Sequence, residues 1–200
     1  MGLFDWLTAK KDAVAIAKYR IWLTREAKSV GIQREVAQAL ANPAGHCVVI
    51  VVAHFNDCVQ QLQTAVAGLD QERVFVTCAE LLADRTPTDF AADPSTSILI
   101  IVGERHPLQS HDDVILEFAR SQPDRCLVVY HVSLEDPLLK PFAGEWVERI
   151  LRQLGMKEDE AIESRLVSRR IQTELEKIAR RATGDAPANS VEEWLERNCP

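Results

Sequence analysis

The segment Cys47-Val48-Val49-Ile50-Val51-Val52-Ala53 is apolar at every position and rich in β-branched residues. A second run of this kind, Ile98-Leu99-Ile100-Ile101-Val102-Gly103, follows later in the chain. Such continuous runs are typical of strands in a parallel sheet, because helices cover both faces and every side chain is buried. Two shorter runs, Arg73–Cys78 and Cys126–Val132, are also predicted as strands, which gives a sheet of about four strands.

Helical patterns alternate with these strands. Asn56–Gly68 has apolar residues at helical spacing and ends at a glycine, and Asp112–Ser121 is followed by Pro123. Strands that alternate with helices form parallel sheets through right-handed crossovers. We therefore predict one α/β domain with helices on both faces of a single parallel sheet.

Further helices are predicted on both sides of this domain. Gly2–Tyr19 and a segment from about Thr24 to Ala41 are helical in pattern, and so are Pro141–Leu154 and a long, charged stretch over Glu158–Ala182. Ser190 opens a last short helix. We expect three parts: an N-terminal helical segment (1–43), the α/β domain (44–156) and a C-terminal helical extension (157–200).

The composition excludes several classes of protein. A net charge of −7 argues against a nucleic-acid binder, because binding to phosphates needs a basic face. The five cysteines are odd in number and form no C-x-x-C pair, which fits a reduced, cytoplasmic compartment. No apolar run approaches eighteen residues, so no transmembrane helix is expected.

Four motifs stand in a fixed order along the second half of the chain. They are Glu104-Arg105-His106, Ser133-Leu134-Glu135-Asp136, Leu154-Gly155-Met156 and Val167-Ser168-Arg169-Arg170-Ile171. In residues and spacing they resemble the second motor domain of the SecA family of preprotein-translocase ATPases and the start of its scaffold helix. The resemblance covers roughly residues 25–182 and implies a RecA-like fold.

The resemblance also shows what has been lost. Where the family carries Arg-Gly-Arg-x-Gly-Arg-Gln-Gly-Asp, this chain reads Leu116-Glu117-Phe118-Ala119-Arg120-Ser121-Gln122-Pro123-Asp124. Arginines at such positions stabilise the charge that develops during phosphoryl transfer. No G-x-x-x-x-G-K-[ST] loop is present either. We therefore expect no ATP hydrolysis, no catalytic residues and no bound cofactor.

A polar cluster follows the second long apolar run, at the edge where α/β sheets bind ligands. It consists of Glu104-Arg105-His106 and His111, Asp112 and Asp113. We favour a polar loop and helix cap inherited from a motor over a ligand site. If nucleotide is sensed, the residues to test are Arg85, Glu104, Arg105 and Arg120.

No metal site is expected from the sequence. His46 and His54 are separated by the length of a strand, and Cys58 falls on a helix where a buried thiol is more common than a nucleophile. The cysteine-rich metal-binding tail of many SecA proteins is missing, and the lone Cys199 does not replace it.

Our first hypothesis is a non-enzymatic module that binds a protein such as a translocase component through the apolar stripe of the 158–182 helix. Because the first motor domain of the family is absent from this chain, part of the stripe is expected to be exposed, or covered by residues 1–40 or by another chain, and an exposed stripe of this kind usually marks an interface. The expected interface residues are Leu166, Arg170, Leu175, Ile178, Trp6 and Trp22.

Two other classes of function remain open. The chain could be half of a split motor, or a nucleotide sensor that completes an ATPase site in trans with another chain. A hydrolase built on the cysteines or histidines is the least favoured class.

The N-terminal segment has two interpretations. Residues 2–19 resemble a helix that lies on a bilayer surface, which would make the protein membrane-peripheral. The favoured interpretation is that this helix packs on the sheet or on a second subunit of an oligomer.

Overall fold

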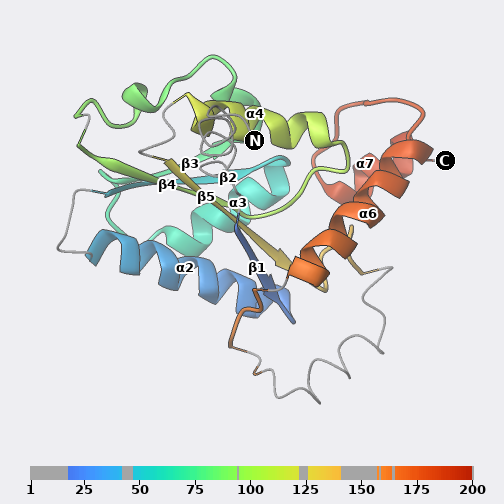
Figure 1. Ribbon diagram of the computed structural model, residues 1–200, viewed down its shortest axis with the longest axis horizontal. Helices are drawn as coiled ribbons and strands as arrows, with labels where there is room; N and C mark the ends of the chain where they lie inside the picture. Colours follow the sequence, from blue (N-terminus) through green and yellow to red (C-terminus); the bar gives the residue numbers. More distant parts are fainter. Residues whose placement is uncertain are drawn as a thin grey trace, which may run out of the picture.

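The computed structural model describes residues 18–41, 47–93, 95–121, 126–140, 157, 159–163 and 165–199. Its centre is one sheet of five parallel strands in the order β1-β5-β4-β2-β3 (Figure 1). The strands are β1 (Lys18–Trp22), β2 (Cys47–Ala53), β3 (Val74–Cys78), β4 (Ser97–Val102) and β5 (Cys126–Ser133). The predicted parallel α/β architecture is confirmed.

Helices cover both faces of the sheet. The helices described are α2 (Arg25–Ala41), α3 (Asn56–Val66), α4 (Gln109–Arg120), α6 (Arg165–Arg181) and α7 (Val191–Asn198), with the 3₁₀ turns η1 (Ala79–Leu82) and η2 (Pro87–Asp89). Val49 and Val51 of β2 pack with α2 and α3, whereas Ile50 and Val52 pack with α4 and η1. Both faces of β2 are therefore buried, which explains why every position of this strand is apolar. None of the helices described is long and apolar enough to cross a bilayer.

The strand β1 corrects the prediction for the N-terminal segment. It pairs in parallel with β5, from Lys18 beside Val129 to Trp22 beside Ser133, so the sheet has five strands where about four were expected. The helix predicted over Gly2–Tyr19 is wrong for its last two residues, and the rest of it lies outside the described residues. The pairing partner is more than a hundred residues away in sequence, so local periodicity could not reveal this strand.

The long C-terminal helix begins later than predicted. Helix α6 starts at Arg165, and Ile162 instead forms an antiparallel bridge with Ile21 of β1. The backbone N–H of Ile21 donates to the Ile162 carbonyl at 3.1 Å, and the Ile162 N–H donates back at 2.8 Å. Pairing with β1 thus replaces the first turn or two of the predicted helix. The helix predicted over Pro141–Leu154 lies outside the described part of the chain.

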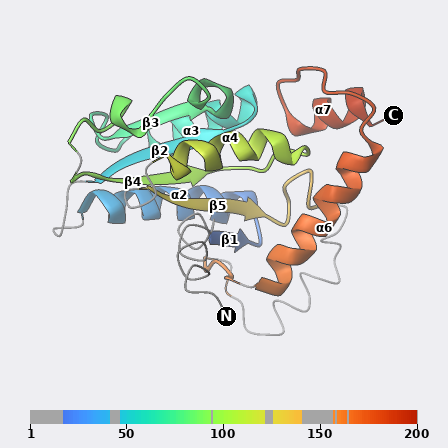
Figure 2. The ribbon, with the colours of Figure 1, turned by 45° about the horizontal axis from the view of Figure 1, so that its top comes forward.

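Helices α6 and α7 lie at the end of the sheet toward which β1 and β5 point (Figure 2). Their apolar residues join the carboxyl ends of these strands in a third core cluster. Its buried members include Ile21, Leu23, Val132, Leu134, Leu138, Leu139, Ile171, Leu175, Val191 and Trp194. The C-terminal segment therefore covers part of the carboxyl edge of the sheet.

Candidate functional site

A cavity of about 370 Å³ lies at the carboxyl edge of the sheet. Helices α2, α3 and α7, the residues just after β4 and the segment around Asp136 enclose it. Its charged lining residues include Arg25, Lys28, Glu104 and Glu192. Ligands of open α/β sheets bind at this edge, so the cavity is the first place to examine for a site.

Lys28 and Asp136 form an ion pair in the wall of this cavity. Lys28 Nζ lies 2.7 Å from Asp136 Oδ1 and donates to the Gly103 carbonyl at 3.0 Å. The other carboxylate oxygen of Asp136 accepts the backbone N–H of Ser133 at 2.7 Å. The aspartate of the Ser-Leu-Glu-Asp motif therefore joins helix α2 to the ends of β4 and β5.

Glu104 joins the ends of two neighbouring strands. Its Oε1 accepts the backbone N–H of His54 at 3.0 Å and that of Phe55 at 2.9 Å, just beyond β2. Burial raises the pKa of Glu104, although the charge of His54 and the two N–H donors act in the opposite direction. This carboxylate has a structural role that its sequence position alone did not show.

Arg105 is held by a buried network. Its Nε donates to Asp112 Oδ2 at 2.7 Å, and His54 Nε2 lies 2.9 Å from Asp112 Oδ1. The guanidinium lies 4.9 Å from the ring centre of Tyr130 and also donates to the Tyr19 hydroxyl. The residue is only 7% exposed.

The ionisation of Asp112 follows from these contacts. Burial opposes it, but the hydrogen bond from His54 and the charge of Arg105 outweigh burial and hold the pKa of Asp112 below its usual value. Arg105 and Asp112 thus form a buried ion pair in which each charge balances the other.

The structure brings together two of the four residues expected to sense nucleotide. Glu104 and Arg105 both line the 370 Å³ cavity. Arg85 is exposed after η1 and does not line it. Helix α4 runs from the carboxyl edge back to the amino edge, so Arg120 at its last residue lies far from Arg105.

The expected interface residues on α6 differ in exposure. Leu175 is 3% exposed and Ile178 packs against the same cluster, because β1, the segment after β5 and α7 cover this face of α6. Arg170 is exposed and pairs with Glu174 at 2.8 Å. The expectation of a free apolar stripe is therefore corrected at Leu175.

The prediction that Trp22 is an interface residue is wrong for a similar reason. It is 5% exposed, stacks on His131 with 5.9 Å between ring centres, and donates from Nε1 to His131 Nδ1 at 3.2 Å. A side chain enclosed in this way cannot act as a surface anchor. Trp6 and the side chain of Leu166 lie outside the described part.

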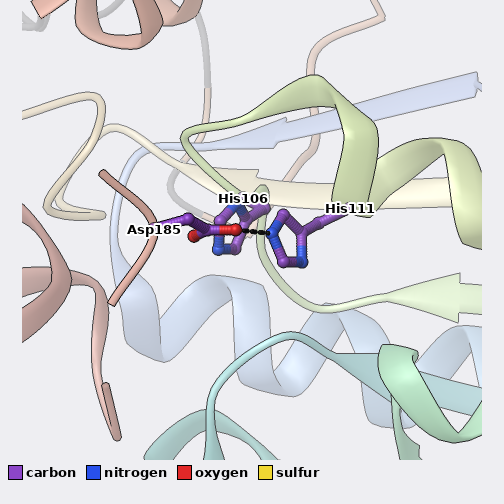
Figure 3. A group of neighbouring side chains, drawn as sticks. All are labelled: His106, His111 and Asp185. Carbon is purple, nitrogen blue, oxygen red and sulfur yellow. Dashed lines mark hydrogen bonds and ion pairs between the residues drawn. The ribbon is translucent and has the colours of Figure 1, made fainter. Parts of the chain in front are cut away.

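The sequence analysis placed His106 and His111 in one polar cluster but missed their third partner, Asp185. His106, His111 and Asp185 lie side by side above the carboxyl edge (Figure 3). The rings of His106 and His111 stack with 3.8 Å between centres, and His111 Nε2 lies 2.7 Å from Asp185 Oδ2. Asp185 follows His111 by 74 positions in the segment between α6 and α7, and no spacing motif relates the two.

The cluster faces a second cavity, of about 410 Å³, which Cys78 and Glu80 also line. Burial, followed by the charges of His54 and His111, lowers the pKa of His106 to about 3. His106 is therefore neutral at physiological pH. Burial acts to raise the pKa of Asp185, but the hydrogen bonds from His111 and Trp194 and the charges of His111 and His106 together outweigh it and hold this pKa below its usual value.

Comparison with known proteins indicates the same family as the sequence motifs. A family model of the SecA P-loop domain matches residues 19–159. The protein translocase subunit SecA of Xanthomonas campestris pv. campestris (strain B100) is 42% identical over 79 residues, which are 40% of this chain and 9% of that protein. SecA of Xanthomonas oryzae pv. oryzae (strain PXO99A) shows the same identity and coverage. The chain thus matches less than a tenth of the length of these relatives.

Proposed function

Because this chain belongs to the SecA P-loop domain family, we propose that it is a non-catalytic SecA-type domain that binds another protein in the course of protein translocation. The curated relatives are translocase subunits, and this chain aligns with a small part of them. A domain of this size can act as a module that a larger assembly recognises. A cytoplasmic location is part of the proposal.

The observation that carries the proposal is the state of the carboxyl edge. Arg105, which lines the cavity at the edge where α/β sheets bind ligands, is buried in an ion pair with Asp112. Helices α6 and α7 pack over the ends of β1 and β5. If Arg105 left Asp112 to contact a phosphate, the buried carboxylate would keep only its contact with His54, and breaking such a buried ion pair costs several kcal/mol as an order of magnitude.

The positions of the lost arginines support the same conclusion. Phe118 is 4% exposed and packs edge-on against Phe90, with 5.7 Å between ring centres. Leu116 is partly buried against the same core cluster. These side chains contribute to the stability of the fold, whereas an arginine that reaches a neighbouring domain must project from the surface.

The outer face of α6 is the surface we assign to the partner. Arg169, Arg170, Glu176, Lys177 and Arg180 are exposed on it, and α6 lies at one end of the molecule (Figure 2). Because its apolar stripe is already used within the chain, a partner would meet charged groups. Charged rims of this kind set specificity and association rate more than affinity.

Photo-crosslinking tests this assignment. Arg170 is replaced by a benzoylphenylalanine, and the chain is irradiated with a purified full-length SecA ATPase of the same cell. We expect a crosslinked product from position 170 and none from the matched exposed position Gln63 on α3. Absence of a product from position 170 and from the four other positions of the outer face would refute the assignment.

A nucleotide sensor is the second candidate, because Lys28 and Arg25 line the 370 Å³ cavity at the carboxyl edge. Cationic groups in a cavity wall favour an anionic ligand, but Asp57, Glu104, Asp136 and Glu192 line the same cavity and oppose it. Lys28 is, however, already paired with Asp136 at 2.7 Å. We therefore rank this candidate below the protein-binding module, and a nucleotide titration separates the two.

A further inference from the structure

Three potential metal ligands converge on the second cavity. His106 comes from the loop after β4, His111 from the first turn of α4 and Asp185 from the segment between α6 and α7. Each offers one ligand atom, and these atoms all lie within 4.8 Å of one another (Figure 3). We propose that His106, His111 and Asp185 bind one divalent zinc-type metal ion, with a fourth coordination position open to the cavity.

The spacing is close to what a metal needs. With Zn–N and Zn–O bonds of about 2.0–2.2 Å, ligand atoms of a tetrahedral site lie roughly 3.4 Å apart. The 2.7 Å contact between His111 and Asp185 would open slightly, and the other separations, which are at most 4.8 Å, would close by up to about 1.4 Å. Asp185 is in an exposed, non-helical segment, which can make this adjustment.

The groups around the ligands are those of a second coordination shell. Trp194 Nε1 donates to Asp185 Oδ1 at 3.0 Å, which leaves Oδ2 directed toward the histidines. His106 Nδ1 lies 3.3 Å from the Leu108 carbonyl and 3.0 Å from its N–H. In the present arrangement Nδ1 accepts the Leu108 N–H; a metal on Nε2 requires the Nδ1–H tautomer, so the ring would have to turn from this N–H to the Leu108 carbonyl, the kind of partner to which ligating histidines usually donate.

The donor set selects the class of metal. Two imidazoles and one carboxylate suit Zn²⁺ and similar transition ions, whereas Mg²⁺ and Ca²⁺ prefer sets made of oxygen alone. A site with three protein ligands keeps one position for water. The ion would join the C-terminal segment to the loop after β4 and to α4, so it would stabilise the folded chain by mass action.

Titration of the full chain, first freed of metal with EDTA, tests the proposal. We expect one equivalent of Zn²⁺ to bind and to raise the melting temperature. Asp185→Asn and His111→Ala should each weaken binding by more than about 100-fold, since even the loss of a group that only hydrogen-bonds a metal ligand costs about 10–100-fold. Asp84→Asn is the matched control, because Asp84 is exposed and does not contribute to the cluster. A melting curve in EDTA identifies any variant that fails to fold.

The five free cysteines require a second measurement. Co²⁺ substituted for Zn²⁺ should give visible ligand-field bands and no sulfur-to-metal charge-transfer band. A charge-transfer band, or Zn²⁺ binding that Asp185→Asn leaves unchanged, would overturn the proposal.

Trp194→Phe isolates the positioning role of the indole. The variant retains the aromatic packing and removes the donor to Asp185. Affinity for Zn²⁺ should fall by about 10–100-fold, and, because Trp194 is 1% exposed, the smaller ring should also lower the melting temperature in EDTA. If the affinity does not change, the indole does not position the carboxylate.

Discussion

Gly31 of α2 shows how one residue sets the distance between a helix and the sheet. A Cβ atom at this position would lie 2.1 Å from Cζ2 of the buried Trp22. No real Cβ contact is that short, so the indole ring occupies the space that a side chain would need. The glycine is retained at the expense of helix propensity, which is about 1 kcal/mol lower than that of alanine.

Gly31→Ala should therefore destabilise the protein. Overpacking typically costs about 1–3 kcal/mol and here exceeds the gain in helix propensity. Gly68→Ala is the matched control, because a Cβ there has nothing within 4 Å, and it should be neutral or slightly stabilising. Urea unfolding measures both. Equal stability of the two variants would show that Trp22 moves aside without cost.

His131 is one source of pH dependence. Burial lowers its pKa, against the effect of Glu35 and with smaller contributions from Arg20 and Lys28. Nδ1 accepts from Trp22 Nε1, so the neutral ring carries its proton on Nε2 and donates to Glu35 Oε2 at 3.1 Å.

A lowered pKa makes the folded state lose stability in acid. The unfolded chain binds a proton below about pH 6.5, whereas folded His131 stays neutral to lower pH. The part of the free energy of unfolding that depends on neutral His131 is fully present above pH 6.5. Below pH 6.5 it falls by at most about 1.4 kcal/mol per pH unit. The free energy of unfolding should thus fall less steeply between pH 7 and 5 in His131→Asn than in the wild type. Parallel slopes in urea unfolding would contradict this account.

At the scale of elements, α6 is stabilised by its contact with the sheet. Its apolar residues Ile171 and Leu175 pack into the cluster formed by β1, the end of β5 and α7. Glu174, also buried on this helix, is paired with Arg170 at 2.8 Å and with Lys177 at 2.9 Å. An amphipathic helix of this kind owes most of its stability to packing.

Leu175→Ala should lower the free energy of unfolding by about 2–5 kcal/mol, the usual range for a buried leucine. The exposed neighbour Glu176 provides the control, and Glu176→Ala should change stability by less than about 0.5 kcal/mol. Chemical unfolding followed by circular dichroism measures both variants. A small effect at Leu175 would mean that α6 is not docked on the sheet in solution.

At the scale of the whole molecule, the arrangement of α6 and α7 over the carboxyl edge predicts weak nucleotide binding at most. Isothermal titration of the chain with Mg-ATP and Mg-ADP should give no binding heat at millimolar nucleotide. Micromolar binding that Lys28→Met abolishes would place the ligand in the 370 Å³ cavity and would favour the nucleotide sensor. The same titration on Arg85→Ala is a control, because Arg85 does not line that cavity.

Much of this fold was predictable from local sequence. The apolar runs at β2 and β4 are buried on both faces, so their composition alone predicts parallel strands. The spacing of apolar residues in α3 and α4 predicted both helices to within a few residues. The four motifs led to the family, and the family match extends over residues 19–159.

Other features depend on contacts between distant segments, which periodicity cannot show. Lys18–Trp22 is a strand because β5 provides its hydrogen-bond partners, and Ile162 is extended because it pairs with Ile21. Because α6 packs over the carboxyl edge, apolar residues that were expected to bind a partner are part of the core instead. The cluster of His106, His111 and Asp185 exists only because the C-terminal segment returns to the loop after β4. The sequence by itself therefore determined the strands and helices that bury their own apolar pattern, while the tertiary structure decided which groups from remote segments meet, because that depends on the path of the whole chain.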